Sequence, residues 1–327
     1  MTSSGSNRLG EFEAIAKLFA PLAAKEPGAL SLTDDAAILD LPFDEDLVVT
    51  VDALIEGVHF LRDDPPATIA KKSLRVNLSD LAAKGATPRA YLLSLSLASW
   101  VGDDWLTQFA RGLGEDQEQY GIALIGGDTT ATPGPLTISI TALGSIAKGM
   151  MIRRSGAVAG DCVFVTGTIG DAGAGLAVLK GGGGTLDKNE RAALIARYRI
   201  PQPRSALGPR LLYIASAALD VSDGLIADLA HIAETSGVRI VVEAARVPLS
   251  DPFREMFGGD DEAIIRAATA GDDYEIAFTA AASARARIEG LGFPITEIGR
   301  VEKGEGVVLL SRDGKALKLS KPGFTHF

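Results

Sequence analysis

The sequence predicts a folded, soluble protein with two domains of mixed α/β and α+β structure. Its 327 residues exceed what one ordinary hydrophobic core holds. Apolar runs of strand length alternate with segments of helical periodicity along the whole chain. A hydrophobic content of 46% beside 23% charged residues is typical of a folded chain. We expect the boundary after residue 146, which gives a first domain over 1–146 and a second over 147–327.

Composition excludes several classes of protein. The mean hydropathy is +0.19, yet no apolar run reaches the 18 residues that a spanning helix needs, so a membrane partner is not expected. The polar start, Met1 to Asn7, has no apolar signal region, so the cytoplasm is the expected location. Cys162 is the only cysteine, which excludes an intrachain disulfide and a cysteine-rich zinc site.

The charge of the chain also limits its ligands. A net charge of −10 and a pI near 4.9 argue against nucleic acid, which needs a basic surface. An acidic protein can still bind phosphates when divalent cations stand between them. The three histidines are scattered, and no Gly-x-x-x-x-Gly-Lys-Ser/Thr loop is present, so neither a dedicated zinc site nor a P-loop is expected.

The first domain reads as helices interleaved with strands. Apolar spacing predicts helices over 11–20, 70–85 and 106–120, and alternation predicts strands over 47–52, 91–98 and 136–142. A further strand begins at Ala123 and is expected to stop at Gly126-Gly127, which deliver Asp128 and two threonines. That end is either a metal and phosphate site, since hard oxygens suit magnesium, or a tight turn with locally satisfied side chains.

Carboxylates recur at other junctions of this domain. Asp34 and Asp35 precede a short expected strand over 36–39 and form either a surface turn or a ligand pair. Asp52 ends the strand over 47–52, with Thr50 pointing to the same side. Asp80 lies near the end of a helix, where the helix dipole disfavours it by about 0.3–1 kcal/mol, so Lys84 or a bound cation should compensate it.

The second domain has the same kind of junction. A strand over 161–166 leads into glycines 167 to 175 before a helix, which is either a phosphate cradle or close strand–helix packing. Asp220, Ser222 and Asp223 precede another helix, where one of them is the N-cap or all of them bind a ligand. Gly271-Asp-Asp-Tyr-Glu275 repeats the pattern before a strand. Arg154 either clamps a phosphate or lies on the surface.

Acidic residues that converge on one cleft would repel one another unless cations were bound among them. Metals bridging the phosphates of a nucleotide would resolve this repulsion and neutralise charge during phosphoryl transfer. The junction acids therefore predict a metal-dependent phosphoryl-transfer site.

Several motifs together carry a family resemblance. They are Gly10-Glu-Phe12, Asp34-Asp35-Ala, Val51-Asp52…Gly57-Val-His-Phe60, Val76-Asn-Leu-Ser-Asp-Leu-Ala-Ala-Lys-Gly-Ala86, Ile125-Gly-Gly-Asp-Thr-Thr130, Arg154-Ser-Gly156, Asp220-Val-Ser-Asp-Gly-Leu225 and Gly271-Asp-Asp-Tyr-Glu275. In this order, over almost the whole chain, they resemble thiamine-monophosphate kinase. The resemblance implies a fold like that of aminoimidazole ribonucleotide synthetase, with a homodimer formed through N-terminal strands. It also implies transfer of the ATP γ-phosphoryl to thiamine monophosphate, and an N-terminal domain that binds ATP and Mg²⁺.

The resemblance also assigns roles to residues. The implied magnesium ligands are Asp35, Thr50, Val51 (through its backbone), Asp52, Asp80, Asp128, Asp220 and Asp223. The implied ATP contacts are Tyr120, Gly127, Asp128, Arg154 and Ser222, of which Asp128 and Arg154, with Asp220, would be catalytic. The implied contacts to thiamine monophosphate are His59, Asp272 and Phe324. The chain departs from the family at Thr33, where glycine is usual, at Asp272, where Glu is frequent, and at Phe324, where Trp or Tyr is common.

Other functions remain as alternatives. Selenophosphate synthetase is disfavoured because no reactive cysteine lies in the N-terminal loop, and the hydrogenase maturation enzyme because no cysteine ends the chain. A synthetase acting on a purine precursor remains possible, as does a nucleotide- or metal-sensing module without turnover.

Overall fold

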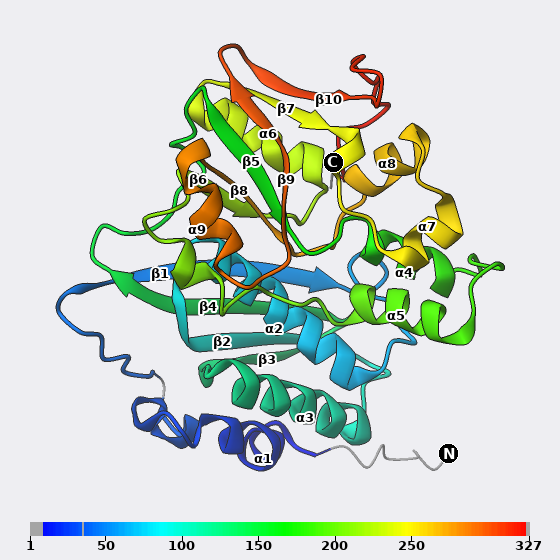
Figure 1. The fold of residues 1–327 in the computed structure, drawn as a ribbon. Helices are drawn as coiled ribbons and strands as arrows, with labels where there is room; N and C mark the ends of the chain where they lie inside the picture. The colour runs from blue at the N-terminus through cyan, green and yellow to red at the C-terminus, as the bar shows by residue number, and fades with distance from the viewer. Residues whose placement is uncertain (1–8, 35, 325–327) are drawn as a thin grey trace. The chain divides into compact units, whose positions relative to one another are not determined.

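A computed structural model describes residues 9–34 and 36–324 of the chain (Figure 1). The described residues form two compact units, each with its own sheet. The first unit comprises 9–81 and 87–149, and the second comprises 82–86 and 150–324. Asp35 lies outside the described residues, so its predicted role as a metal ligand stays a prediction.

The first unit is built on a four-stranded mixed sheet. Its strands are β1 (Glu45–Ile55), β2 (Thr87–Ala98), β3 (Ala123–Thr132) and β4 (Thr137–Ala147). The order is β1-β4-β2-β3; β2 and β3 are parallel, and β4 is antiparallel to both of its neighbours. The two strands that carry Asp52 and Asp128 are therefore the two edges of the sheet.

Helix α3 (Asp103–Tyr120) and all but the last two residues of helix α2 (Pro66–Ala83) belong to the same unit as this sheet (Figure 1). Alternate residues of the strands are buried, among them Val48 and Leu54 on β1 and Leu93 and Leu95 on β2. The alternating β1 residues Leu47, Val49 and Val51 have exposed apolar side chains. This one-sided burial is the period-two pattern of an antiparallel sheet with one open face.

The two helices approach each other closely at Gly112 of α3. A Cβ atom added there would lie 2.4 Å from the carbonyl oxygen of Ala67 in α2. We expect Gly112→Ala to lower the free energy of unfolding by about 1–3 kcal/mol, because backbone cannot yield as a side chain can. Gly114 lies in the same helix, where a Cβ would meet only the Leu22 side chain at 3.3 Å. Gly114→Ala should change stability by less than about 1 kcal/mol in chemical denaturation; equal losses in both variants would contradict this packing.

The second unit is built on a six-stranded mixed sheet. The strands are β5 (Asp161–Thr166), β6 (Ala217–Asp220), β7 (Arg239–Glu243), β8 (Ile276–Ala281), β9 (Ile295–Glu302) and β10 (Gly306–Leu310), in the order β10-β7-β9-β5-β8-β6. The helices are α4 (Asp171–Leu179), α5 (Lys188–Arg199), α6 (Leu225–Ser236), α7 (Asp251–Phe257), α8 (Asp261–Ala268) and α9 (Arg285–Glu289). The main core of this unit joins the sheet to these helices through residues such as Val163, Leu219 and Leu229.

Three expectations about local structure need correction. Residues 36–39 form no strand; Ile38 is exposed, and its N–H donates to the carbonyl of Gly28. The segment over 11–20 is helical but irregular, with α1 (Glu11–Ala14), a π-turn over Ile15–Phe19 and a 3₁₀ turn over Ala20–Ala23. Strand β3 continues through both glycines to Thr132 instead of stopping at them. Among the described residues, no helix has the length and apolar character needed to cross a membrane.

Candidate active site

The paired glycines of β3 admit a close approach between strands. A Cβ atom at Gly127 would lie 1.9 Å from the carbonyl oxygen of Leu93 on β2, so no other residue fits there. The register of β2 and β3 shifts just before this point, between Tyr91 and Leu92. Asp128 follows inside the strand and is exposed. The tight-turn interpretation of this stretch is therefore wrong, and the glycines instead allow β3 to lie close against β2.

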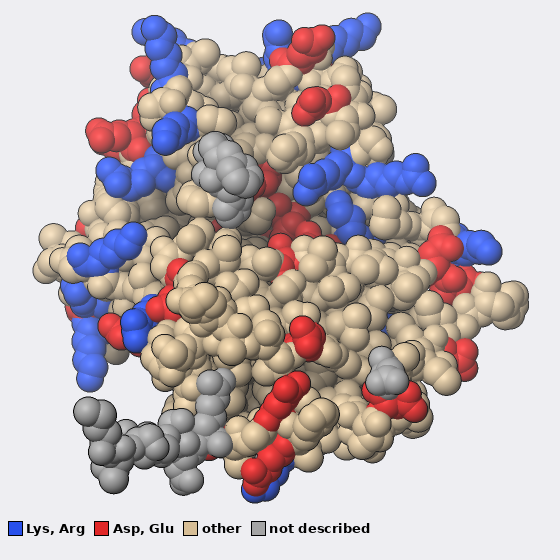
Figure 2. Space-filling model, turned by 180° about the vertical axis from the view of Figure 1, so that it is seen from behind, with Lys and Arg blue, Asp and Glu red and all other residues tan. Residues whose placement is uncertain are grey.

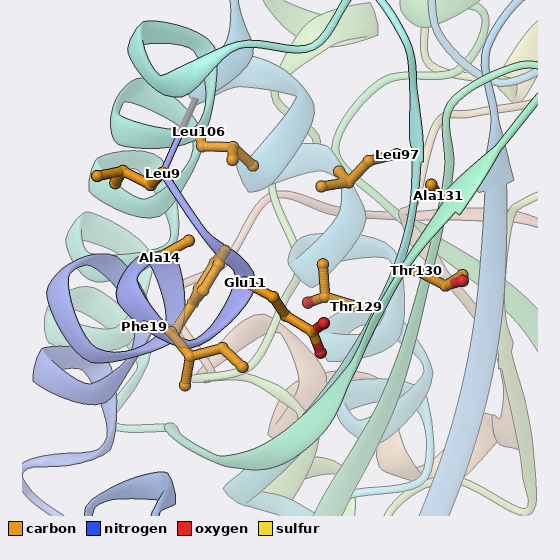
Figure 3. Close-up of a pocket in the computed structure, with 10 residues that line it drawn as sticks. Leu9, Glu11, Ala14, Phe19, Leu97, Leu106, Thr129, Thr130 and Ala131 are labelled. Atoms are coloured by element: carbon orange, nitrogen blue, oxygen red, sulfur yellow. The ribbon is translucent and has the colours of Figure 1, made fainter. Parts of the chain in front are cut away.

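A cavity of about 590 Å³ lies beside these residues. Residues 126–129 of β3 line one part of it, and Phe12 and Asp34 from the N-terminal segment line another. A neighbouring cavity of about 280 Å³ is drawn in Figure 3, where Thr129 and Glu11 point toward each other and Thr130 points away. The larger cavity is in the volume range of small-ligand sites. The structure thus places Gly127 and Asp128 at the wall of a ligand-sized cavity, together with Asp34.

A second group of predicted ligands lies on β1 and α2. The hydroxyl of Thr50 donates a hydrogen bond of 2.6 Å to Oδ2 of Asp80. Asp52 is two residues from Thr50 on the same strand and therefore projects from the same face. Val51 projects from the open face and is exposed. The structure thus gathers one hydroxyl and two carboxylates, which are hard oxygen donors of the kind that magnesium prefers.

Two other predicted contact residues belong to this unit. His59 accepts the N–H of Ile55 at Nδ1, and its carbonyl accepts a hydrogen bond from the buried ammonium of Lys72 at 2.8 Å. The loop is therefore anchored at both the ring and the backbone of His59.

Tyr120 ends α3, where the guanidinium of Arg75 lies over its ring, 5.2 Å from the centroid. Arg75 itself forms a buried ion pair with Asp116 at 2.7 Å.

A third group lies at the end of β6 in the second unit. Asp220 is the last residue of the strand and is buried. The N-cap of the following helix α6 is Gly224, and no side chain caps this helix directly. The interpretation of Ser222 or Asp223 as the N-cap is therefore wrong. The N–H groups of Asp223 and Gly224 are instead accepted by the carboxylate of Asp228, both at 3.0 Å.

The carbonyls of this acidic loop, residues 220–224, are bonded by two other segments. Val221 O accepts from the N–H of Tyr274, and Ser222 O accepts from the N–H of Asp272, both at 2.8 Å. Asp223 O accepts from the N–H of Phe324 at 2.9 Å. The backbone of the loop is thus held by the two segments that carry the predicted thiamine contacts, Asp272 and Phe324.

Asp228 is an acid whose ionisation is disfavoured by its surroundings. Burial, with repulsion from Asp223, raises the pKa of Asp228 to about 7. The positive charge of Arg154 acts in the opposite direction and lowers this pKa. The carbonyl of the preceding residue, Arg153, accepts a hydrogen bond of 3.0 Å from the N–H of Ala218, so this segment lies beside β6, the strand that leads into the acidic loop. The side chain of Arg154 is itself exposed. The second unit therefore brings Arg154 into the neighbourhood of Asp223, as a phosphate clamp would require.

Asp228 should make stability depend on pH in the metal-free protein. Between pH about 4 and about 7 the carboxyl is ionised in the unfolded chain and protonated in the folded one, so stability falls as pH rises. Relative to Asp228→Asn, the wild type should lose up to about 4 kcal/mol over this interval. Urea denaturation of both proteins at pH 4, 5.5, 7 and 8 without divalent cations measures this difference. A difference that does not change with pH would contradict the raised pKa.

The glycine loop before α4 does not hold a phosphate. The N–H groups of Gly170 and Ala172 donate to the carboxyl group of Asp273, at 2.7 and 3.4 Å, so an internal acceptor occupies this helix start. A Cβ at Gly175 would lie 2.1 Å from the carbonyl oxygen of Leu194 in α5. The phosphate-cradle interpretation is therefore wrong, and close packing accounts for the glycine. Burial raises the pKa of Asp273 well above its ordinary value.

Glu275 is the centre of a buried polar network that sequence reasoning did not identify. Its carboxylate accepts hydrogen bonds from Arg197 at 2.8 Å, from Nε of Arg204 at 2.6 Å and from the hydroxyl of Thr166 at 2.5 Å. Glu275 stands in a quoted motif, but nothing in the sequence pairs it with these arginines. Asp228 was also missed, although an acid in the first turn of a helix is a known signal for bonding to the preceding backbone.

The two groups of the first unit lie on opposite edges of its sheet. β1 and β3 are separated by β4 and β2, which makes three strand spacings, or about 14 Å, between the strands of Asp52 and Asp128. Over residues 9–34 and 36–324, no three His, Cys, Asp or Glu side chains form a group that could hold a metal by themselves. A metal bound here would need hydroxyl, backbone, water or phosphate oxygens as further ligands, which is the usual coordination of magnesium.

The distribution of surface charge also limits the ligand. On the face shown in Figure 2, Lys and Arg side chains are scattered and interspersed with Asp and Glu. This face therefore carries no continuous basic patch of the kind that a nucleic-acid backbone requires.

Comparisons with known proteins assign the family. Residues 33–146 match the N-terminal domain model of AIR synthase related proteins, and residues 158–311 match the C-terminal one. A thiamine-monophosphate kinase of Caulobacter vibrioides is 43% identical, over 97% of this chain and 90% of its own. The thiamine-monophosphate kinase structure from Stenotrophomonas maltophilia has a TM-score of 0.82 at 43% identity, over 91% of this chain and 95% of its own. AaThiL, complexed with AMPPCP and TMP, has a TM-score of 0.78 at 33% identity, over 99% and 100%. This chain therefore belongs to the thiamine-monophosphate kinase family, within the AIR synthase related proteins.

Proposed function

We propose that this protein transfers the γ-phosphoryl group of ATP to thiamine monophosphate, forming thiamine diphosphate and ADP. The observation that carries the proposal is the acidic loop after β6, whose side chains are not used to cap the following helix. The carboxylate and hydroxyl oxygens of Asp220, Ser222 and Asp223 are donors of the kind that divalent cations prefer. The relatives named above and the AMPPCP and TMP complex of AaThiL support the same substrates.

We propose Mg²⁺ as the cation, because the donor set consists of carboxylate and hydroxyl oxygens. Asp52, Asp80 and Thr50 would hold one cation in the first unit, with Asp35 and the backbone of Val51 as further ligands. Asp128 lies on the opposite edge strand and would bind a separate cation. Asp220 and Asp223 would hold a cation in the second unit. When bound, magnesium would neutralise phosphate charge during the transfer.

The other residues would bind and orient the two substrates. Gly127 would allow the backbone of β3 to approach the ATP phosphates, with Tyr120 and Ser222 as further contacts. Arg154 would stabilise the transferred group by charge, as a fixed guanidinium does. His59, Asp272 and Phe324 would hold the thiamine part of the acceptor. Since no nucleophilic side chain is implied, the phosphoryl group would pass directly between the substrates.

The reaction is tested by measuring ADP release with magnesium and ATP in the presence of different acceptors. We expect ADP and thiamine diphosphate in equal amounts with thiamine monophosphate, and no release above background with thiamine or with phosphorylated purine precursors. Release with a purine precursor alone would favour a synthetase. Binding of ATP without turnover under every condition would favour a sensor and would overturn the proposal.

We also propose that the protein is a homodimer formed through the open face of the first sheet. Leu47, Val49 and Val51 of β1 are 45%, 54% and 61% exposed, and Leu92 of β2 lies on the same face by register. Exposed apolar side chains in such a row are typical of a surface covered by a partner.

The single cysteine fits a reducing compartment, so we place the protein in the cytoplasm.

A negative charge introduced on this face should disrupt the proposed dimer. Val49→Glu should convert the dimer into a monomer, because two like charges would be buried in a symmetric interface. Leu309→Met, in the buried core of the second unit, is the control that should leave the mass unchanged. Light scattering after size exclusion measures both, and a monomeric wild type would refute the interface.

A further inference from the structure

The segment Gly271–Glu275 alternates between buried and exposed positions. Asp273 and Glu275 are buried at 1% and 0% exposure, whereas Asp272 and Tyr274 are partly exposed. Asp272 has φ +70° and Tyr274 has φ +51°, so both residues adopt the left-handed conformation that non-glycine residues rarely adopt. Such conformations persist only where surrounding contacts impose them, and they concentrate at functional sites.

The two buried carboxylates impose this conformation. Asp273 is bonded by the N–H groups at the start of α4, and Glu275 by two arginines and Thr166. The intervening backbone N–H groups of Asp272 and Tyr274 are bonded to the acidic loop. The backbone of the segment is thus fixed on both sides before any ligand binds.

The rigid backbone presents two side chains together. The hydroxyl of Tyr274 donates a hydrogen bond of 3.1 Å to Oδ1 of Asp272. Because both residues are held in left-handed conformations, the ring and the carboxylate lie side by side although they are only two residues apart. One hydroxyl therefore fixes the rotation of the Asp272 carboxylate.

We propose that Tyr274 is a positioning residue for the acceptor, which orients the carboxylate of Asp272 toward the thiamine part of thiamine monophosphate. The inference rests on the proposed function, in which Asp272 binds this acceptor. The aminopyrimidine ring of thiamine carries an amino group that donates hydrogen bonds, and a carboxylate of fixed orientation accepts such a bond with a defined direction. Tyr274 acts through Asp272 and has no contact with ATP in this proposal.

The test is Tyr274→Phe, which removes the hydroxyl and keeps the ring. We expect KM for thiamine monophosphate to rise about 3–10-fold, in keeping with the net contribution of one ordinary hydrogen bond. KM for ATP and kcat should stay within twofold of the wild type, and the melting temperature should not change. The matched control is Tyr213→Phe, since Tyr213 also has a positive φ of 64° but is 78% exposed on the surface.

A double-mutant cycle with Asp272→Ala separates positioning from a general structural effect. In the Asp272→Ala background, Tyr274→Phe should leave kcat/KM for thiamine monophosphate unchanged, because the hydroxyl has no carboxylate to orient. Calorimetric binding of thiamine monophosphate in the presence of Mg²⁺ and ADP should show the same pattern without turnover. A full effect of Tyr274→Phe in that background, equal rises in both KM values, or no rise at all would overturn the inference. A wild type that releases no ADP with thiamine monophosphate would instead refute the proposed function.

Discussion

Asp220→Asn and Asp128→Asn should each lower kcat by about 10²–10³-fold, while the folded protein remains intact. Each change removes one charge from an oxygen that is proposed to bind magnesium, and leaves its shape. Asparagine has nearly the same size and shape as aspartate, so we expect the melting temperature to change by only a few degrees in either variant. Steady-state ADP release with thiamine monophosphate, together with circular dichroism melting, measures both effects.

The matched control is Asp260→Asn. Asp260 also precedes a helix, but its side chain accepts the N–H of Ala263 and is a true N-cap. Asparagine caps helices as well as aspartate does, so this variant should keep both activity and stability. Wild-type turnover in Asp220→Asn or Asp128→Asn would remove that residue from the metal site. Loss of turnover in Asp260→Asn would show that the assay responds to any change of charge.

Glu275→Gln should lower the free energy of unfolding by about 3–5 kcal/mol, because it leaves two arginines and a buried hydroxyl without their common anion. The side chain of Glu275 is fully buried, whereas those of Arg197 and Arg204 are about one-fifth exposed. Breaking one side of such a network costs far more than the pairing gains, since the remaining charges stay desolvated. Chemical denaturation at pH 7 measures the loss.

Glu297→Gln is the corresponding surface control. Glu297 also pairs with two arginines, Arg246 and Arg285, but these are about half exposed. Solvent screening should limit the loss at this site to less than about 1 kcal/mol. A loss at Glu275 that is no larger than the loss at Glu297 would show that the buried network is not a main support of the second unit.

The sequence predicted most elements because their patterns are local. Alternation in β4 and helical spacing in α2 and α6 depend only on neighbours along the chain. The continuation of β3 through Gly126 and Gly127 could not be predicted from the sequence. Glycine is required at position 127 because the carbonyl of Leu93, on another strand, lies close to it. The four residues from 36 to 39 read as a strand, but so short a run forms one only where a partner strand is present.

The parts of the site that were not predicted likewise depend on contacts between segments that are far apart in the sequence. Residue type alone showed that acids gather at junctions, and motif order carried the family resemblance. Neither could show that the carboxylates of Asp228 and Asp273 accept hydrogen bonds from backbone N–H groups. The arginine partners of Glu275 come from α5 and the segment after it, at sequence separations of 78 and 71 residues.

The backbone of the acidic loop has a consequence for protein engineering. Residues 221–224 are held by hydrogen bonds to three separate parts of the chain: the N–H groups of Tyr274, Asp272 and Phe324 donate to this loop, and the carboxylate of Asp228 accepts from it. A graft of only the five residues Asp-Val-Ser-Asp-Gly onto another scaffold would lack these hydrogen bonds. We expect the grafted residues to cap the following helix instead of keeping the conformation of this loop. To keep the conformation of the loop, a graft must therefore include the segments that form these hydrogen bonds.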